Sequence, residues 1–453
     1  MSLGEVGTAV DLVVLGAGPA GYTAAIRAAQ LGKNVAVVEP GILGGTCLNE
    51  GCIPSKALLM AVDRAWRLRG LSKMGIEISQ SRVNLPQMQQ WKRSIVQLLT
   101  DGVGKLLKSN NIDMVPGCGR FVDDHTVQVH GSKGEQTLTF ERAIVAVGTK
   151  PRPLSDLPFD HQRVLTAHDA LNLDHLPEQM VIIGWNYIAA ELTTLFAKLN
   201  VSVRLLVPAG RRLLAEFDVA VGRHIETQLR KLGVKTEHEV TNLPAAVSDA
   251  AKVIVCAGAV PNTAGLNLEA VGVETDPRGY IPVNDRLESS NPRIYAVGDV
   301  NGGLPLASLA FKQGKIAAEA IAGRRVHYAP QAIPIVAWTD PEIASVGLTP
   351  TEAEAAGYAI KTTRFPIGAS GRSVTLNATG GLVVTVAEKE TQILLGVTIV
   401  GPHAGEFIGE AALGIEMGAT LLDLVETLHP HPSLGEALQD SAEAALMKAI
   451  HVL

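Results

Sequence analysis

The sequence predicts an α/β protein with several domains. Its 453 residues correspond to roughly three domains of average size. Apolar residues make up 47% and charged residues 19%, a balance that excludes a disordered chain and allows more than one buried core. A β-branched run, a glycine-rich turn, an alanine-rich helical pattern and a second β-branched run follow one another near the N-terminus, and this order recurs near residue 180. Two such units indicate parallel strands connected by helices.

Charge and cysteine content limit the classes of partner. The 39 basic residues are outnumbered by 45 acidic ones, so neither nucleic acid nor an anionic membrane is an expected partner. The longest apolar segment without a charge, residues 12–26, is interrupted by glycines and a proline and is too short to span a bilayer. Four cysteines in a chain of this length do not form a secreted disulfide framework, so a cytoplasmic protein is expected.

Residues 11–39 contain the first strand–helix–strand unit. The glycines of a G-x-G-x-x-G pattern stand at its turn, and Glu39 closes the second strand. Gly16 allows the tight turn, Gly18 lets the backbone approach a pyrophosphate, and Gly21 lets the helix pack closely on the strand. The helix N-terminus would face the phosphates, and Glu39 would accept a ribose hydroxyl. Any tight turn can produce the glycine pattern, but strand, helix and terminal acid together predict a dinucleotide site.

The rest of the chain continues this pattern and then departs from it. Residues 180–207 repeat the strand–helix–strand order after a proline-rich stretch near Pro151 that indicates an interdomain crossing. Residues 294–299 suggest a strand ending in Gly298 and Asp299, followed by a helix over 307–322, so the first domain is expected to resume there. From residue 333 onward an α+β module is expected. Its predicted strands are 335–338, 382–388 and 393–401, and its predicted helices are 406–417 and 434–450.

A close cysteine pair follows the first unit. Cys47 and Cys52 lie in the segment GGTCLNEGCIPSKALL, in which Pro54 is placed in the first turn of a helix. Amide groups at a helix N-terminus stabilise a thiolate, so a C-x₄-C pair there can close a disulfide or open to a nucleophile. A zinc site is the weaker alternative because the other two cysteines are isolated and no histidine lies nearby, and inert buried thiols are a further alternative. The pattern favours redox chemistry without a metal.

This cysteine segment resembles that of the FAD-dependent pyridine nucleotide-disulfide oxidoreductases, and its Leu-Asn and Ile-Pro-Ser-Lys positions are most similar to the dihydrolipoamide dehydrogenases. Three further motifs resemble those of the same family and occur in the same order: YAVGDV at 295–300, TDPEIASVG at 339–347 and LHPHPSLGEA at 428–437. The resemblance covers nearly the whole chain. It implies two Rossmann-like dinucleotide-binding domains and a C-terminal α+β dimerisation domain. The expected parts are 1–150 (FAD-binding, first part), 151–264 (NAD-binding-like), 265–332 (FAD-binding or central, second part) and 333–453 (interface).

The resemblance also assigns roles to residues. It implies that Cys47 is the interchange thiol that meets lipoamide and that Cys52 lies beside the flavin as the charge-transfer thiolate. Lys56 would pair with Glu191 and stabilise negative charge on the reduced flavin. Without the resemblance, Asp299 is an ordinary turn aspartate. The residues implied to bind FAD are Gly16, Gly18, Gly21, Glu39, Gly148, Gly298 and Asp299, and Gly184 is the corresponding glycine for NAD.

His431 and Glu436 match the acid–base pair of the family. The imidazole would remove a proton from the dithiol substrate, and the carboxylate would fix its tautomer. In relatives this histidine reaches into the partner's active site, so the resemblance implies a symmetric homodimer. Taken alone, the His-Pro-His-Pro run indicates a surface loop, and His429 beside His431 is a weak signal for a metal.

The second nucleotide unit departs from the family pattern. Gly184 is kept, but Trp185 and Asn186 follow it, and a side chain in place of the second glycine should crowd a pyrophosphate. Asparagine readily adopts left-handed backbone, so the turn itself is expected to survive. The next strand ends in Leu205, Leu206 and Val207 where NAD-using members have an acid, and no carboxylate is expected there.

Two further features concern the choice of nucleotide. Ala259 and Val260 stand where the family commonly has arginine. Arg204, Arg211 and Arg212 could serve the 2′-phosphate of NADP, although solvated loop charges explain them equally well. NAD binding is therefore expected to be weakened or altered.

The predicted function is that of an FAD-containing homodimer that oxidises a dihydrolipoyl group on a lipoylated carrier protein, with NAD⁺ as acceptor. One alternative is an NADPH-dependent or specialised reductase of a small disulfide. The other is a flavin subunit whose nicotinamide pocket is degenerate and which relays electrons or binds a partner.

Overall fold

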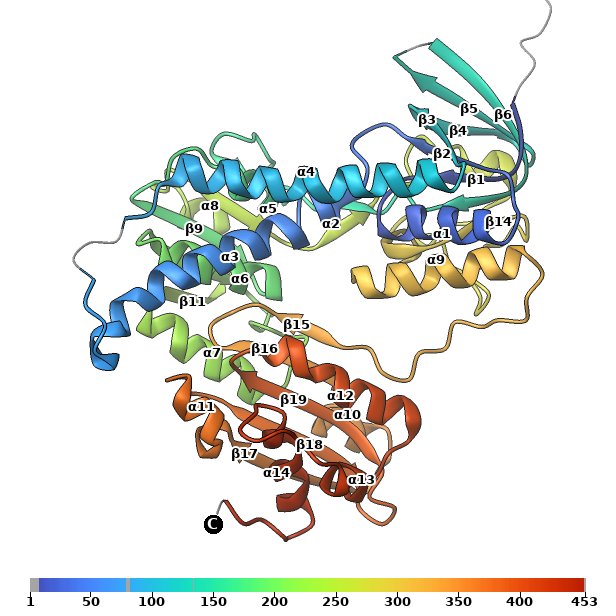
Figure 1. Cartoon of the computed structure of the whole chain (residues 1–453). Helices are drawn as coiled ribbons and strands as arrows, with labels where there is room; N and C mark the ends of the chain where they lie inside the picture. The colour runs from blue at the N-terminus through green and yellow to red at the C-terminus, as the bar shows by residue number, and fades with distance from the viewer. Residues whose placement is uncertain (1–7, 79–81, 133, 452–453) are drawn as a thin grey trace, which may run out of the picture.

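The chain folds into parallel and antiparallel sheets with helices between their strands. The computed structural model describes residues 8–78, 82–132 and 134–451 (Figure 1). Within these residues the strands form one sheet of seven, two sheets of five and one isolated pair. One mixed sheet, one parallel sheet and a C-terminal antiparallel sheet, combined with helices, confirm the predicted α/β class.

The first sheet is centred on β1 (Thr8–Leu15), which lies parallel between β2 (Val35–Glu39) and β6 (Gly134–Val145). Leu12 and Val13 are fully buried, as expected for a strand covered on both faces. The order is β3-β2-β1-β6-β5-β4. Its other strands are β3 (Asp113–Pro116), β4 (Cys118–Asp123), β5 (Thr126–Gly131) and β14 (Ile294–Ala296), the last of which pairs parallel with β6.

Two helices that are far apart in the sequence pack together on this sheet. Figure 1 shows α1 (Pro19–Gln30) beside α9 (Ala307–Ile321). A Cβ at Gly314 would lie 2.4 Å from the Ala20 carbonyl oxygen, so only glycine allows this approach. This helix contact and the pairing of β14 with β6 together place residues 294–321 in the first unit.

The second sheet is entirely parallel, in the order β11-β10-β9-β12-β8. Its strands are β8 (Val164–Leu165), β9 (Gln179–Gly184), β10 (Ser202–Pro208), β11 (Lys235–Val240) and β12 (Val253–Cys256). Its helices are α5 (Ala167–Leu171), α6 (Tyr187–Lys198), α7 (Val219–Lys231) and α8 (Leu243–Ala246). The chain enters and leaves this unit through an antiparallel pair, β7 (Thr149–Pro151) and β13 (Ala259–Pro261), at the predicted crossing. The short helix η2 (Leu268–Val271) follows.

The third sheet forms the C-terminal part of the molecule, in the order β15-β16-β19-β18-β17, and is antiparallel throughout. Its strands are β15 (Ile335–Ala337), β16 (Glu342–Gly347), β17 (Ile360–Pro366), β18 (Leu382–Glu388) and β19 (Leu394–Gly401). Its helices are α10 (Pro350–Ala355), η4 (Ile367–Ala369), α11 (Gly371–Thr375), α12 (Ala404–Met417), α13 (Leu421–Glu426) and α14 (Glu436–Ala445). The helix expected over 434–450 is therefore shorter than predicted.

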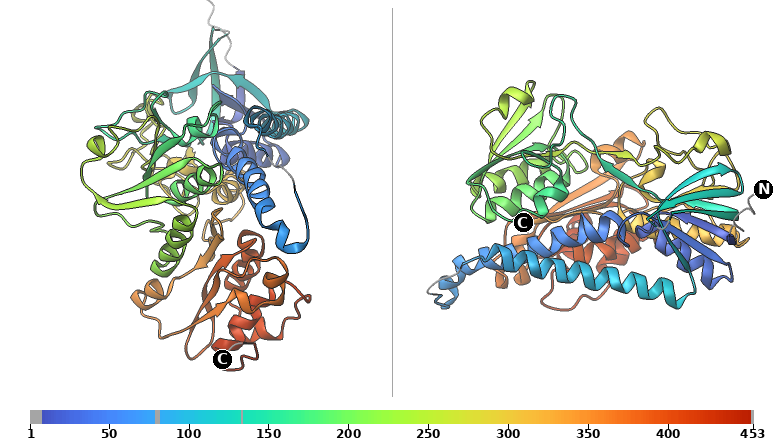
Figure 2. Two further views of the ribbon diagram at one scale, coloured as in Figure 1. Left: turned by 90° about the vertical axis from the view of Figure 1, so that its left-hand side faces the viewer. Right: turned by 90° about the horizontal axis from the view of Figure 1, so that it is seen from above.

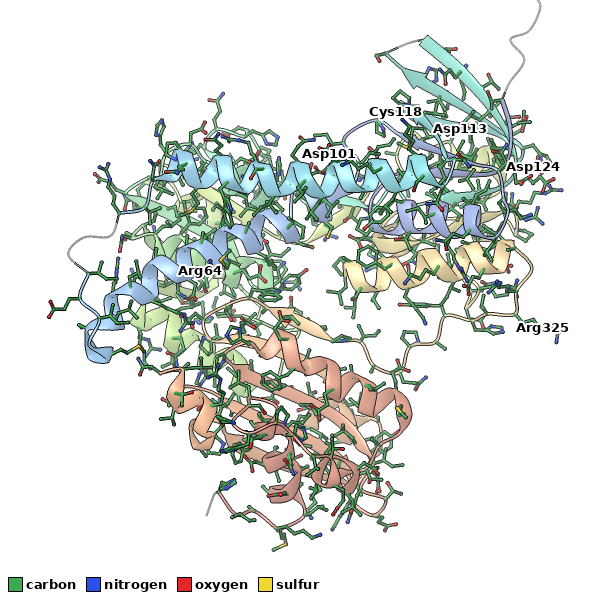
Figure 3. All side chains as sticks on the ribbon, viewed as in Figure 1. Arg64, Asp101, Asp113, Cys118, Asp124 and Arg325 are labelled. Carbon is green, nitrogen blue, oxygen red and sulfur yellow. The ribbon has the colours of Figure 1, made fainter. Side chains whose placement is uncertain are left out.

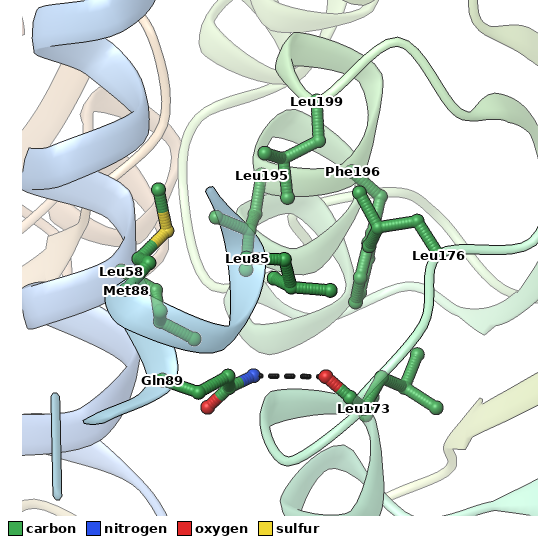
Figure 4. A pocket seen from close by; sticks show the side chains of 10 residues that line it. Leu58, Leu85, Met88, Gln89, Leu173, Leu176, Leu195, Phe196 and Leu199 are labelled. Carbon is green, nitrogen blue, oxygen red and sulfur yellow. Dashed lines mark hydrogen bonds between the residues drawn. The ribbon is translucent and has the colours of Figure 1, made fainter. Parts of the chain in front are cut away.

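Four helical segments after β2 join the two nucleotide units. They are α2 (Gly45–Asn49), α3 (Cys52–Arg67), η1 (Leu68–Met74) and α4 (Leu85–Ser109). Figure 2 shows α3 and α4 running side by side. Near the start of α4, Gln89 donates to the Leu171 and Leu173 carbonyls at 3.1 Å, as Figure 4 shows for Leu173. The adjoining cavity of about 10 Å³ is lined mainly by apolar side chains and is too small for a substrate.

Within the described ranges, no helix combines the length and the apolar character needed to cross a bilayer.

Candidate active site

The turn after β1 leaves space for a ligand at one of its three glycines. Gly16 has a φ of +101°, and a Cβ on Gly21 would lie 1.9 Å from the Gly16 carbonyl oxygen, so both positions require glycine for the turn and for packing. A Cβ on Gly18 would meet only the Gly45 Cα, at 3.8 Å. The protein therefore does not fill the space above Gly18, where a pyrophosphate could approach the backbone.

The N-terminus of α1 is also available to an anion. No described side chain caps this helix. The Glu39 carboxylate does not cap the helix; it stabilises the turn before it by accepting the Ala17 N–H at 2.7 Å and the Gly41 N–H at 2.8 Å. Free amide groups and the helix dipole at such an end favour a phosphate. These features fit the diphosphate of FAD.

Asp299 lies in η3 (Gly298–Asn301), just after β14. Its carboxylate accepts the Thr149 hydroxyl at 3.4 Å, and burial raises the pKa of Asp299. Gly298 (φ +76°) and Gly148 (φ +64°) both have left-handed backbone, which suits glycine. The structure thus brings the segment around Gly148 to Asp299, and the long hydrogen bond leaves this carboxylate able to accept a ligand hydroxyl.

The cysteine pair stands where α2 meets α3. Cys47 lies within α2, and Cys52 is the first residue of α3. A hydrogen bond from Cys47 and the positive charge of Lys56 lower the pKa of Cys52 to about 7, against the opposing effect of burial. The same hydrogen bond, followed by burial, raises the pKa of Cys47. Cys52 is therefore the more acidic thiol of the pair, and Cys47 is the one that keeps its proton.

Lys56 and Glu191 connect the cysteine helix with the second nucleotide unit. The Lys56 Nζ lies 2.7 Å from a Glu191 carboxylate oxygen, and the other oxygen accepts the Trp338 N–H at 2.9 Å. The Glu191 side chain is only 5% exposed, so its charge is held in place by both partners. Trp338 follows β15, and this contact also ties the C-terminal region to the site.

Tyr187 is a site residue that the sequence predictions did not include. Burial raises its pKa, and so do the negative charges of Glu191, Cys52 and Asp299. The phenol is therefore close to members of both predicted halves of the site. Its position four residues before Glu191, on the same face of α6, is the signal that could have identified it.

His431 and Glu436 form the second predicted pair. The His431 Nδ1 lies 2.7 Å from a Glu436 oxygen, and the other oxygen accepts the Ser433 N–H at 2.6 Å. Although burial acts in the opposite sense, these two hydrogen bonds lower the pKa of Glu436. The His431 side chain is 81% exposed, so its Nε2 faces outward.

The structure does not bring this histidine to the cysteines of its own chain. Glu436 begins α14, which packs on α13, β17 and β18. Figures 1 and 2 show α14 in the C-terminal part of the molecule, at the opposite end from α2. A site that uses both pairs needs a second copy of the chain.

His429, the other histidine of the His-Pro-His-Pro run, and the two isolated cysteines do not belong to either predicted pair. The buried His429 ring contacts the Glu410 carboxylate at 2.8 Å and the Thr427 carbonyl at 2.9 Å. Cys118, labelled in Figure 3, begins β4 of the first sheet, and Cys256 is buried at the end of β12. Among the described residues, no group of three histidine, cysteine or acidic side chains is placed to hold a metal.

The turn after β9 differs from the prediction at Asn186. Asn186 has φ −91° and ψ 176°, so it is extended rather than left-handed, because it serves as the N-cap of α6 and accepts the Ala189 N–H at 3.1 Å. The expectation that no carboxylate stands at the end of the next strand was correct. No acid ends β10, but the loop that follows it brings Glu216 to the start of α6, where it accepts the Tyr187 N–H at 3.4 Å.

The three arginines near this turn have partners within the protein. Arg204 pairs with Glu237 at 3.1 Å and lies 3.5 Å from Asp249. Arg211 lies over the Trp185 ring, 4.7 Å from its centroid. Arg212 donates to backbone carbonyls, among them that of Phe217 at 2.8 Å. These contacts give all three guanidinium groups a structural role.

Comparison with known proteins identifies the family. Residues 10–314 match the family model described as pyridine nucleotide-disulphide oxidoreductase. Residues 333–442 match the dimerisation domain of the same family, which supports a homodimer.

Curated relatives and solved structures agree with these matches. The chain is 40% identical to a dihydrolipoyl dehydrogenase of Haloferax volcanii and 40% identical to one of Geobacillus stearothermophilus, in each case over 100% of both chains. The crystal structure of LpdA from Mycobacterium tuberculosis superposes with a TM-score of 0.89 and 26% identity, covering 96% of this chain and 99% of that one. The HOCl-induced flavoprotein disulfide reductase RclA from Escherichia coli gives 0.84 and 25% over the same shares.

These relatives do not favour the two alternative functions, because the dihydrolipoyl dehydrogenases use FAD and NAD(H). Two family models together span most of the chain, and the relatives match it over its full length. The structure adds a thiol pair near a dinucleotide turn that is open to a ligand. The chain belongs to the pyridine nucleotide-disulphide oxidoreductase family and is a flavin-dependent enzyme of the lipoamide dehydrogenase type.

Proposed function

We propose that the enzyme oxidises dihydrolipoyl groups on a carrier protein, with NAD⁺ as the electron acceptor. The observation that carries this proposal is the Cys47–Cys52 pair at the junction of α2 and α3, with the Lys56–Glu191 ion pair one turn beyond Cys52. The similarity to dihydrolipoyl dehydrogenases over the full chain supports the choice of substrate. The low number of cysteines supports a reducing compartment, the cytoplasm, as its location.

The residues proposed to hold FAD come from two separate parts of the first unit. The open space at Gly18 and the uncapped N-terminus of α1 suit its diphosphate, with Gly16 and Gly21 shaping the turn. Asp299, beside Gly298, suits hydroxyl groups of the cofactor. Glu39 and Gly148 complete the proposed set. When bound, FAD supplies a two-electron carrier between the cysteine pair and NAD⁺.

The residues of this chain account for the thiol chemistry. In the oxidised enzyme, a substrate thiolate attacks the Cys47 sulfur, the Cys47–Cys52 bond breaks, and Cys52 leaves as the more acidic thiolate. The second substrate thiolate then attacks the substrate sulfur of the mixed disulfide, which closes the lipoyl ring and releases Cys47. Overall, dihydrolipoyl and NAD⁺ give lipoyl, NADH and one proton.

His431 is proposed to accept the substrate thiol protons at Nε2. Glu436 holds Nδ1 at 2.7 Å, which fixes the tautomer that leaves Nε2 free to accept. Because His431 lies away from the cysteines of its own chain, it would act on those of the partner subunit. The dimerisation domain supports this arrangement.

Steady-state kinetics with the FAD-loaded protein test the proposal. Dihydrolipoamide with NAD⁺ should produce NADH, and Cys47→Ser should abolish this turnover while the protein stays yellow. Cys118→Ser is the matched control, since this exposed thiol begins β4. Turnover that requires NADP⁺, or that survives Cys47→Ser, would contradict the assignment.

A further inference from the structure

The two dinucleotide turns of this chain differ at the helix that follows each. At α1, no described side chain caps the first turn, and Gly18 faces open space. At α6, Asn186 accepts the Ala189 N–H at 3.1 Å, and Glu216 accepts the Tyr187 N–H at 3.4 Å. A pyrophosphate bound in the Rossmann manner would need these amide groups. Two of them are already used by the side chains of this protein.

Glu216 is the more consequential of these two caps because it carries charge. A carboxylate at a helix N-terminus satisfies the same amide groups and dipole as a phosphate does, so the two anions compete for one place. The nearest positive charge acting on it is that of Arg212, whose guanidinium is bound to backbone carbonyls. A nucleotide pyrophosphate would therefore meet both a filled position and a like charge.

The contacts that hold Glu216 in this place are weak. Its hydrogen bond to Tyr187 is long, and among the described residues its other oxygen is buried without a partner. Burial also raises the pKa of Glu216. A buried carboxylate oxygen without a partner recovers hydration when it moves out, so leaving this position is inexpensive.

The loop that carries Glu216 is also strained. Leu214 is fully buried and has a φ of +54°, a left-handed conformation that a leucine rarely adopts. Its N–H donates to the Trp185 carbonyl at 2.6 Å, which pins the loop to the turn. Arg212 also donates to the Ala215 and Phe217 carbonyls, so the loop backbone is held on both sides of Glu216 and the glutamate side chain is the part that can move.

We propose that Glu216 is an affinity-determining gate, which occupies the place of the nucleotide pyrophosphate at the start of α6 and must swing out before NAD⁺ binds. This inference rests on the proposed function, because it concerns the acceptor of that reaction. It explains how a chain with a closed second turn keeps NAD⁺ as its acceptor. The gate lowers affinity for the nucleotide without removing the site.

Calorimetric titration of the FAD-loaded dimer with NAD⁺ tests the gate. Removing the competing carboxylate in Glu216→Ala should lower the Kd for NAD⁺ by about tenfold. Glu216→Gln keeps the shape but not the charge and should lower it by a smaller factor. Glu178→Gln is the matched control, since this exposed glutamate precedes β9 and so lies at the end of that strand away from the turn. The Kd of this variant for NAD⁺ should equal that of the unmodified protein.

Three outcomes separate this inference from the proposed function. An unchanged or undetectable affinity in both Glu216 variants overturns the gate. A tighter Kd in Asn186→Gly alone also overturns it, because the asparagine would then be the obstacle. Bleaching of the flavin absorbance by dihydrolipoamide needs no nucleotide. If bleaching fails while the Kd still shifts, the proposed function fails and the gate stands.

Discussion

The thiols of Cys47 in α2 and Cys52 at the start of α3 differ in acidity because the hydrogen bond between them favours the Cys52 thiolate. The donated hydrogen bond and the nearby Lys56 charge stabilise the thiolate of Cys52, whereas Cys47 keeps its proton. In the proposed reaction this difference sets which sulfur leaves and which one meets the substrate. The asymmetry is therefore a property of two residues and their nearest neighbours.

The first prediction concerns the titration of this thiolate. Because the pKa of Cys52 is lowered to about 7, thiolate absorbance of the reduced protein should be present above that pH and lost below it. Cys47→Ala removes the hydrogen-bond donor, so the midpoint should rise by about one unit. Ultraviolet absorbance against pH measures both midpoints, with Cys118→Ser as control. Equal midpoints in the unmodified protein and Cys47→Ala would refute the assigned donor.

Single residues also show where sequence reasoning stops. The contacts of Lys56 with Glu191 and of His431 with Glu436 were expected, because each residue belongs to a motif that the chain preserves. Glu216 belongs to no motif. It reaches α6 only through the fold of a loop, pinned by the Leu214 N–H, and no local pattern encodes such a contact.

At the scale of elements, a buried lysine joins two helices and a turn. The Lys198 side chain at the end of α6 is 3% exposed, and its Nζ lies 2.5 Å from Asp63 of α3 and 2.6 Å from Asp340, just before β16. The helix that begins at Cys52 is thereby fixed to α6 and to the turn before β16. The two carboxylates share this ammonium group and also contact Arg67, which lies 2.6 Å from Asp63 and 3.7 Å from Asp340.

The second prediction is a loss of stability when this lysine is removed. Lys198→Met removes the buried cation between Asp63 and Asp340 and leaves Arg67 as their remaining partner. We expect the free energy of unfolding to fall by about 2 kcal/mol, since both carboxylates are partly hydrated and keep this second cation. Urea denaturation measures the change. Lys235→Met is the control, because that lysine is 73% exposed in its pair with Glu237 and should change stability by less than about 0.5 kcal/mol. Equal effects would refute the role of Lys198.

The third prediction concerns a lysine buried in α4. Lys92 is 2% exposed and donates to the Leu171 carbonyl and to Asn172, and burial, followed by the charge of Arg93, lowers its pKa from 10.5 to about 8. Between these two values the unfolded chain binds more protons, so the free energy of unfolding should rise with pH across this window. Urea midpoints at a series of alkaline pH values measure the slope. The slope should decrease in Lys92→Met, and an unaltered slope would contradict the assignment.

The elements themselves were predictable to different degrees. The expected helix at 307–322 and the strand at 382–388 correspond to α9 and β18, whose apolar spacing is regular. α4 was not among the predicted elements. Its burial runs against the usual pattern, since Lys92 is buried whereas Leu98 is 71% exposed. Apolar periodicity therefore gives no clear signal for it.

At the scale of the whole molecule, the proposed active site is divided between two chains. The cysteines lie beside the nucleotide units, and His431 projects from the C-terminal region with its imidazole exposed. The sequence implied this division through a resemblance, because the distance between the two pairs depends on how the domains are arranged. If each site takes its cysteines from one chain and its histidine from the other, dimers of two different inactive variants should regain activity.

The fourth prediction is that two inactive variants restore activity to each other in a mixed dimer. Cys47→Ser and His431→Gln homodimers should each be nearly inactive. When subunits of the two variants are mixed and allowed to exchange, a mixed dimer contains one site with both native residues, so about a quarter of the native activity should return. Dihydrolipoamide turnover before and after exchange measures the recovery. No recovery, with mixed dimers verified by mass spectrometry, would place both residues in one chain's site.

The return of β14 and α9 to the first unit has a consequence for synthesis of the chain. The middle sheet is complete once residues 164–256 have left the ribosome, because all of its strands come from that stretch. The N-terminal sheet, although made first, lacks β14 and the helix that covers α1 until residue 321 has emerged. The middle sheet can therefore form during translation before the N-terminal sheet is complete. The apolar surface of α1, although it is synthesised first, stays exposed until α9 has been made.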